Sequence, residues 1–209
     1  YSVSTLTHPD DEFSVPDVSG AFDAAPAAVQ SEVETVDGVH RRLAGSAAHL
    51  GFEHVPMSQP IDLTVVEQTL EVLVKEGLIA PTIAEMVDTA GIAAFFQTKP
   101  GAAAAAAKQA VLREWPFTLG IDATELGANA PDQRVILQGI VDLIIPTAEG
   151  LIVVDFKTDR ILNDTVLHHR IERYREPLAW YSRAAGTLLK KPVLSCWLYF
   201  ADCRKAIPL

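Results

Sequence analysis

The sequence predicts an α/β fold in which a mixed central sheet is flanked by helices and preceded by a helical layer. Three observations lead to this prediction. Apolar residues recur with helical spacing through the first half of the chain. Runs rich in Val, Ile, Leu and Phe, which are typical of strands, follow in the second half. A long segment of helical character separates the last two of these runs, as expected of a helix that connects two strands.

The first 38 residues are predicted to form a flexible acidic arm, and residues 39–209 to form one domain. The arm has eight acidic residues, no Lys or Arg, and no clear hydrophobic period. It accounts for most of the net charge of -10, because the rest of the chain carries 17 bases against 19 acids. Between residues 155 and 205 ten bases face six acids. This basic third is suited to binding phosphates, although a solvated helix face explains it equally well.

The helical layer is predicted from capping residues and from spacing. The predicted helices cover residues 39–54, 63–76 and 82–97, with a further segment starting in the alanine run 102–107. Asp62 is the expected cap of the second of these helices, and Gly77 ends it. Thr82 and Glu85 have the spacing of a capping box for the next one. Lys99-Pro100-Gly101 is expected to interrupt the chain before the alanine run.

The sheet is predicted from apolar runs in the second half. The predicted strands cover residues 111–120, 134–145, 151–156 and 193–200, and a helix over residues 166–187 precedes the last strand. A turn over residues 146–150 joins the second and third strands into a hairpin.

The candidate metal-binding and catalytic residues lie on this hairpin. Asp155 and Lys157 are two apart in a strand, so their side chains point to the same face. Folding the hairpin brings Asp142 opposite Asp155, give or take one residue. Two adjacent carboxylates raise each other's pKa unless a cation intervenes, and a hard divalent cation is the natural one. Such an ion can activate water for attack on a phosphodiester, with Lys157 orienting that water. An ordinary ion pair between Asp155 and Lys157 is the competing interpretation.

Five segments occur in an order and spacing that supports the first interpretation. They are Gly45-Ser46-Ala47-Ala48-His49, Arg113-Glu114-Trp115-Pro116-Phe117, Gln138-Gly139-Ile140-Val141-Asp142, Val154-Asp155-Phe156-Lys157-Thr158-Asp159, and Tyr174 to Tyr181. This pattern resembles the RecB-like nuclease domain of the PD-(D/E)XK superfamily, and within it the domains of AddA-type helicase–nuclease subunits. The resemblance implies a restriction-endonuclease-like core. The related AddB-type domains hold an iron–sulfur cluster on four cysteines, which Cys196 and Cys203 cannot supply, so no such cluster is expected.

The resemblance also implies roles for individual residues. His49, Asp142 and Asp155 are expected to bind Mg²⁺, with Mn²⁺ as a substitute, and Lys157 is the expected catalytic lysine. The remaining candidates are expected to support these ligands or to face the substrate: Glu114, Tyr174 and Tyr181. The family usually has Gln in the helix between the two tyrosines, where this chain has Pro177.

The function implied is a Mg²⁺-dependent DNA exonuclease domain of a helicase–nuclease that processes double-strand breaks. Because the chain begins at Tyr1, we expect a helicase region to precede it in a longer chain, and a second nuclease or helicase subunit to be its partner. Single-stranded DNA ends are the expected substrate, and the cytoplasm the expected compartment. One alternative is a catalytically impaired module that binds DNA or has a structural role in the same complex. Another is a free-standing restriction-like endonuclease.

Overall fold

The strands that the structure describes form a single mixed sheet in the order β1-β2-β3-β4-β5. This computed structural model describes residues 36–57, 60–126 and 133–209. The strands are β1 (Leu112–Asp122), β2 (Arg134–Pro146), β3 (Leu151–Lys157), β4 (Val193–Phe200) and β5 (Lys205–Pro208). Of these, β3 and β4 pair in parallel and the other neighbours are antiparallel, and the long helix α7 (Asp164–Leu189) connects β3 to β4. The predicted α/β fold with a mixed, helix-flanked sheet is therefore confirmed.

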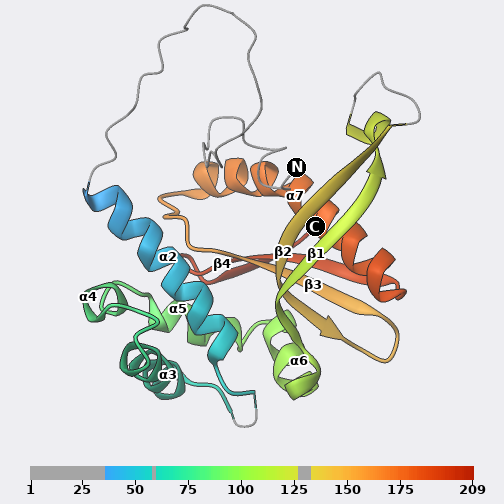
Figure 1. Ribbon diagram of the computed structural model, residues 1–209. Coiled ribbons are helices and arrows are strands. Elements are labelled where there is room, and N and C mark those ends of the chain that lie inside the picture. The colour runs from blue at the N-terminus through green and yellow to red at the C-terminus, as the bar shows by residue number, and fades with distance from the viewer. Residues whose placement is uncertain (1–35, 58–59, 127–132) are drawn as a thin grey trace, which may run out of the picture.

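Helices cover both faces of this sheet (Figure 1). Before the sheet come α2 (Val36–His54), α3 (Leu63–Lys75), α4 (Pro81–Ala84), α5 (Thr89–Phe95) and α6 (Lys99–Ala107). These helices share one hydrophobic core with one face of the sheet, which we call the α2-side core. Helix α7 packs against the other face in a second core, the α7-side core. Among the described residues, no helix is both long enough and apolar enough to cross a membrane.

The helical layer agrees with the sequence at Asp62 and differs from it in three places. Asp62 caps α3 by accepting from the amide of Val65, as predicted. The single helix expected over residues 82–97 is wrong, because Asp88 breaks it into α4 and α5 and caps the second piece through the amide of Gly91. The predicted capping box does not form, since Pro81 already occupies the first turn of α4. Lys99-Pro100-Gly101 begins α6 rather than interrupting the chain, because Thr98 caps it.

Of the predicted acidic arm, residues 1–35 lie outside the described residues. Helix α2 begins at Val36, slightly before the predicted start of the domain. Helix α7 is continuous through Pro177. Figure 1 shows its axis changing direction along its length, as a proline inside a helix is expected to cause.

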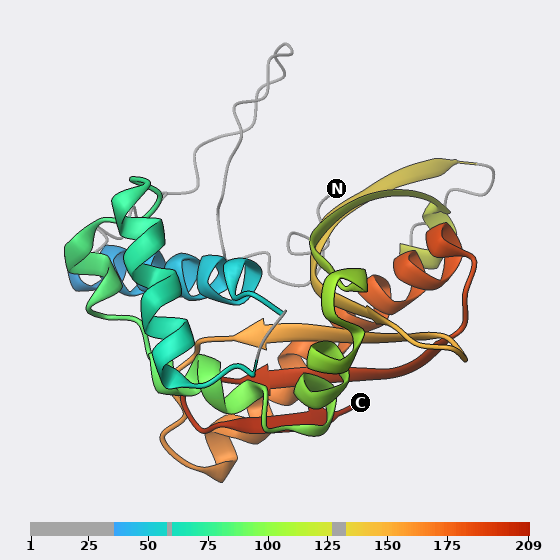
Figure 2. The same ribbon diagram turned by 90° about the horizontal axis from the view of Figure 1, so that it is seen from below.

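Strands β1 and β2 leave the sheet together as a curved ribbon (Figure 2). Their pairing keeps one register from Leu112↔Ile144 to Asp122↔Arg134. Within the ribbon, Phe117 and Val141 pack in the α7-side core. Leu143, only two residues after Val141, packs in the α2-side core instead. Because residues two apart in a regular strand share a face, the faces of the ribbon exchange between Val141 and Leu143.

An aromatic cluster holds α2 to the sheet. The Phe52 ring of α2 stacks on Phe156 of β3 with centroids 3.8 Å apart and planes at 5°. Phe95 meets the Phe52 ring edge-on at 5.9 Å, and Tyr199 does so at 6.2 Å. Phe52 is 4% exposed, so it is the main apolar anchor of the helix on β3.

Replacing this anchor should destabilise the whole domain. We expect Phe52→Ala to lower the free energy of unfolding by about 3–5 kcal/mol, because a buried aromatic ring is lost and a cavity remains. Leu43→Ala, on the same helix but at a side chain 47% exposed, is the matched control and should change it by less than about 0.5 kcal/mol. Urea unfolding followed by circular dichroism measures both. Equal effects of the two variants would contradict the assignment of Phe52 as the anchor.

Candidate active site

A cleft of about 1020 Å³ lies between α2, the end of β3 and α7. His49, Glu114, Lys157 and Tyr174 are among the residues that line it. Asp142 and Asp155 are buried next to these residues, with 9% and 3% of their surface exposed. Six of the seven predicted site residues thus lie at or beside one cleft, and the seventh, Tyr181, lies elsewhere.

His49 reaches the cleft from the middle of α2. Gly45 lies one turn earlier on the same face, and a Cβ there would be 3.0 Å from the Thr158 hydroxyl oxygen. The absence of a side chain at Gly45 therefore lets α2 approach the end of β3 closely. This explains in physical terms why a glycine stands four residues before the histidine.

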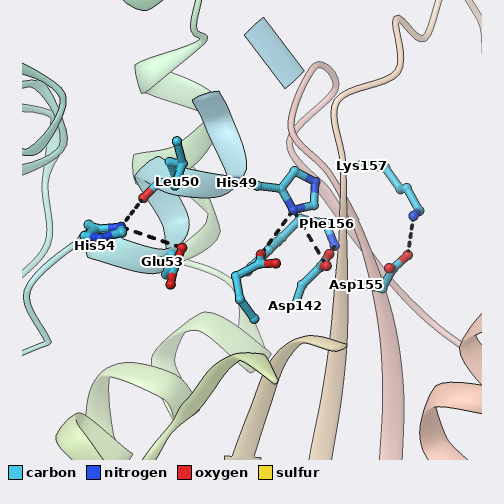
Figure 3. Close-up of polar contacts among 9 residues, drawn as sticks. His49, Leu50, Glu53, His54, Asp142, Asp155, Phe156 and Lys157 are labelled. Carbon is cyan, nitrogen blue, oxygen red and sulfur yellow. Dashed lines mark hydrogen bonds and ion pairs between the residues drawn. The ribbon is translucent and has the colours of Figure 1, made fainter. Parts of the chain in front are cut away.

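Asp142 is fixed by a buried hydrogen bond at the point where β2 stops pairing with β3. The last paired residues are Leu143 and Val154. Extending that register by one residue sets Asp142 opposite Asp155, as the hairpin predicted. There the Phe156 amide donates to Oδ2 of Asp142 at 2.6 Å (Figure 3). The side chain of Asp142 thus takes the place of a main-chain acceptor.

Glu114 completes a group of three with His49 and Asp142. Nδ1 of His49 lies 3.4 Å from Oε1 of Glu114 and 3.6 Å from Oδ1 of Asp142. Glu114 has a φ of 43°, which is uncommon for a residue with a side chain. Arg113 also contacts α2 through the carbonyl of Glu53, so two successive side chains of β1 point to the same side. The left-handed backbone of Glu114 accounts for this departure from strand alternation.

Asp155 and Lys157 form an ion pair on the other side of β3. The Lys157 Nζ lies 2.7 Å from Oδ2 of Asp155 and 4.2 Å from the centre of the Tyr174 ring. Figure 3 shows the carboxylates of Asp142 and Asp155 pointing toward the same end of the strands. The ammonium group is therefore held between a carboxylate and an aromatic face, beside the group of three.

Asp159 was not selected from the sequence but belongs to this arrangement. It accepts a hydrogen bond of 2.9 Å from the Tyr174 hydroxyl and lies 3.2 Å from Nε of Arg170. Asp159 therefore fixes the ring on which Lys157 rests. Its position two residues after Lys157, in the same motif, was the available signal.

Tyr181 lies two turns further along α7 than Tyr174 and outside the cleft. Its ring meets Phe117 edge-on at 6.0 Å. A Cβ at Gly139 would be 3.3 Å from the Tyr181 ring. Tyr181 thus contacts the β1–β2 ribbon rather than the group around His49.

Burial and charge shift the pKa values of this group strongly. Burial, and then the nearby charge of Asp155, raises the pKa of Asp142 to about 7. Burial lowers the pKa of His49, but Asp142 and Glu114 raise it by more, and the net direction is upward. The pKa of Lys157 is raised as well, since Asp155 and Asp142 outweigh the opposing effect of burial. The negative charge gathered in this group thus favours the protonated forms of all three residues.

A divalent cation fits this group by its chemistry. His49, Glu114 and Asp142 each offer one ligand atom, and these atoms lie within 4.8 Å of one another. Two carboxylate oxygens and one imidazole nitrogen are suitable ligands for Mg²⁺ or Mn²⁺. The carboxylates are held on strands and the imidazole on a packed helix, so little reorganisation is needed.

Comparisons with known proteins identify the family of the chain. Residues 28–205 match the model of the PD-(D/E)XK nuclease superfamily. The chain is 32% identical over 186 residues, or 87% of its length, to an ATP-dependent helicase/nuclease subunit of Moorella thermoacetica. It is 33% identical over 167 residues, or 76% of its length, to the protein of the same name from Geobacillus thermodenitrificans. In both cases the chain spans only 13% of the relative's length.

The raised pKa of Asp142 predicts how the metal-free fold responds to pH. Between about pH 4 and pH 7 the folded protein keeps a proton on Asp142 that the unfolded chain has released. Stability is therefore lost as the pH rises, by roughly 1.4 kcal/mol per unit from this group alone. The amide side chain of the Asp142→Asn variant cannot ionise. The free energy of unfolding of this variant, relative to the wild type, should therefore increase by roughly 1.4 kcal/mol per pH unit between about pH 4 and pH 7.

Urea unfolding in a chelating buffer at several pH values measures this difference. Asp164→Asn, at a carboxylate 95% exposed on α7, is the control and should follow the wild-type curve. Parallel curves for Asp142→Asn and the wild type would show that Asp142 ionises normally in the fold.

Proposed function

Because the chain belongs to the PD-(D/E)XK nuclease superfamily, we propose that it is a Mg²⁺-dependent DNA exonuclease domain. One observation carries this proposal: His49, Glu114 and Asp142 gather within 4.8 Å, beside the ion pair of Asp155 and Lys157. Oxygen ligands for a hard cation thus stand next to a fixed ammonium group. Both can stabilise the charge that develops when a phosphodiester is hydrolysed.

In this proposal His49, Asp142 and Asp155 would hold Mg²⁺ or, as a substitute, Mn²⁺. Asp155 also pairs with Lys157 through Oδ2 at 2.7 Å. Glu114, the third member of the group within 4.8 Å, would offer a further carboxylate oxygen to the ion. A bound ion supplies positive charge to the phosphate and lowers the pKa of water. No iron–sulfur cluster is part of the proposal.

Lys157 is the proposed catalytic lysine. Its ammonium group orients the attacking water and neutralises charge that develops on the phosphate. Asp155 and the Tyr174 ring fix this group before substrate binds. A group that is already in place needs little reorganisation during the reaction.

The substrate we propose is single-stranded DNA at its ends. Within the part of the chain that the structure describes, the cleft is lined by Lys157 and by four arginines: Arg41, Arg42, Arg160 and Arg170. Guanidinium groups form bidentate hydrogen bonds with phosphates and can therefore bind a DNA backbone. Their position in the cleft supports DNA binding there despite the chain's net charge of -10.

The relatives suggest a wider context. They are named helicase/nuclease subunits, and this chain matches 13% of their length. We propose that the domain follows a helicase region in a longer chain and acts with a second nuclease or helicase subunit. Its role would be the processing of double-strand breaks for recombinational repair in the cytoplasm.

A second candidate function is a module of the same complex that binds DNA but cleaves it poorly. Pro177 favours this candidate, because it is buried on α7 between Tyr174 and Tyr181. The family usually has a glutamine there, whose amide helps to hold the active site and the DNA backbone. Proline offers no side-chain polar group and no amide proton.

Cleavage assays separate the two candidates. The whole chain should degrade linear single-stranded DNA with Mg²⁺, leave it intact with a chelator, and leave circular single strands intact. Asp155→Asn and Lys157→Gln should each lower the rate at least ~100-fold, because a ligand and the orienting charge are lost. Arg175→Met, at an exposed side chain paired with Glu172, is the control and should retain the wild-type rate.

Each outcome of these assays has a distinct meaning. DNA binding without cleavage under Mg²⁺ and Mn²⁺ would support the second candidate. Cleavage of circular strands would contradict the exonuclease assignment. Circular dichroism of each variant excludes loss of the fold as the cause of lost activity.

Pro177→Gln tests what the missing glutamine does. The substitution restores an amide donor inside α7 and places a polar group on the face that carries Tyr174. We expect the cleavage rate to rise several-fold while the Mg²⁺ affinity changes little, because His49, Asp142 and Asp155 lie on other elements. An unchanged rate would mean that the glutamine does not limit this domain. Isothermal titration calorimetry with Mg²⁺ provides the affinity.

A further inference from the structure

We propose that Arg113 is a positioning residue that sets the place of α2 along β1 and thereby brings His49 to the carboxylates. This inference rests on the proposed metal site and extends it to a residue that touches neither the ion nor DNA. Arg113 precedes Glu114 in β1, and its guanidinium donates to the main chain of α2. Three contacts and the local backbone support this role.

The first contacts are at the end of α2. Nη1 of Arg113 donates to the carbonyl of Glu53 and, at 2.9 Å, to that of Val55. Carbonyls in the last turn of a helix lack amide partners within the helix. A cation at this end also interacts favourably with the helix dipole. The guanidinium therefore acts as the C-terminal cap of α2, supplied by a strand that lies about 60 residues away along the chain.

The next residue of β1 makes the other contact. Glu114 lies 3.4 Å from Nδ1 of His49, and His49 is one helical turn before Glu53. Neighbouring residues of β1 thus attach to neighbouring turns of α2. Two attachment points fix both the rotation of the helix and its position along its axis, which apolar packing alone determines less sharply.

The left-handed backbone at Glu114 makes both attachments feasible at once. In a regular strand, Arg113 and Glu114 would point to opposite faces. With a φ of 43° at Glu114, both side chains reach α2. Residues with a Cβ rarely adopt this backbone conformation, and it persists only where surrounding contacts stabilise it. The bonds of Arg113 to α2 are part of those surroundings.

The Mn²⁺ affinity of Arg113 variants tests this positioning role. Arg113→Met keeps an apolar stem and removes the donors, so we expect Mn²⁺ affinity in calorimetry to fall about 10- to 100-fold, as for other residues that orient ligands. Arg113→Lys retains one charged donor and should give an intermediate loss. Arg175→Met should bind Mn²⁺ like the wild type. At saturating Mn²⁺ the cleavage rate of Arg113→Met should recover, because the catalytic groups remain.

Thermal unfolding in a chelator separates positioning from general stability. A lower melting temperature with unchanged Mn²⁺ affinity would overturn the inference and leave Arg113 a structural cap. If Arg113→Met does not fold, Arg113→Lys carries the same test. A wild-type chain that binds no Mn²⁺ would instead refute the proposed metal site itself, so the two failures are distinguishable.

Discussion

Everything around the cleft depends on the point where β1 and β2 turn together out of the sheet. Glu114 and Asp142 occupy equivalent places in the two strands, since the pairs on either side keep one register. Both side chains turn toward α2, and the Phe156 amide binds Asp142 at 2.6 Å. The turn therefore converts two ordinary strand positions into one acidic pair that faces a histidine. The same turn frees the rest of the ribbon to cover α7.

The sequence predicts the hairpin well because its constraints are local. Two apolar runs and the turn over residues 146–150 determine the pairing that sets Asp142 opposite Asp155. The side on which Glu114 lies could not be predicted, since strand alternation assigns Arg113 and Glu114 to opposite faces. Strand β5 has four residues, too few for a hydrophobic pattern. The break at Asp88 was missed because the apolar spacing continues across it, and only the cap shows where one helix ends.

The buried carboxylates of the site destabilise the fold, and other contacts must compensate for them. Asp142 and Asp155 are buried close together, and burial raises the pKa of Asp142 to about 7. The buried carboxylate of Asp142 opposes folding when it ionises, so other contacts must offset its cost. The rings of Phe52, Phe95 and Phe156 provide such contacts directly beneath α2. The proposed cation would reduce this repulsion, and its binding would therefore stabilise the fold.

Pro177 lies on a helix that carries none of the proposed metal ligands. His49, Asp142 and Asp155 lie on α2, β2 and β3, while Tyr174, Arg170 and Pro177 lie on α7. The two sets meet at Lys157, whose ammonium group contacts Asp155 on one side and the Tyr174 ring on the other. A change in α7 can therefore alter how a phosphate is presented without disturbing the ligand group. Pro177 therefore bears on the proposed DNA contacts of α7 and leaves the proposed metal ligands in place.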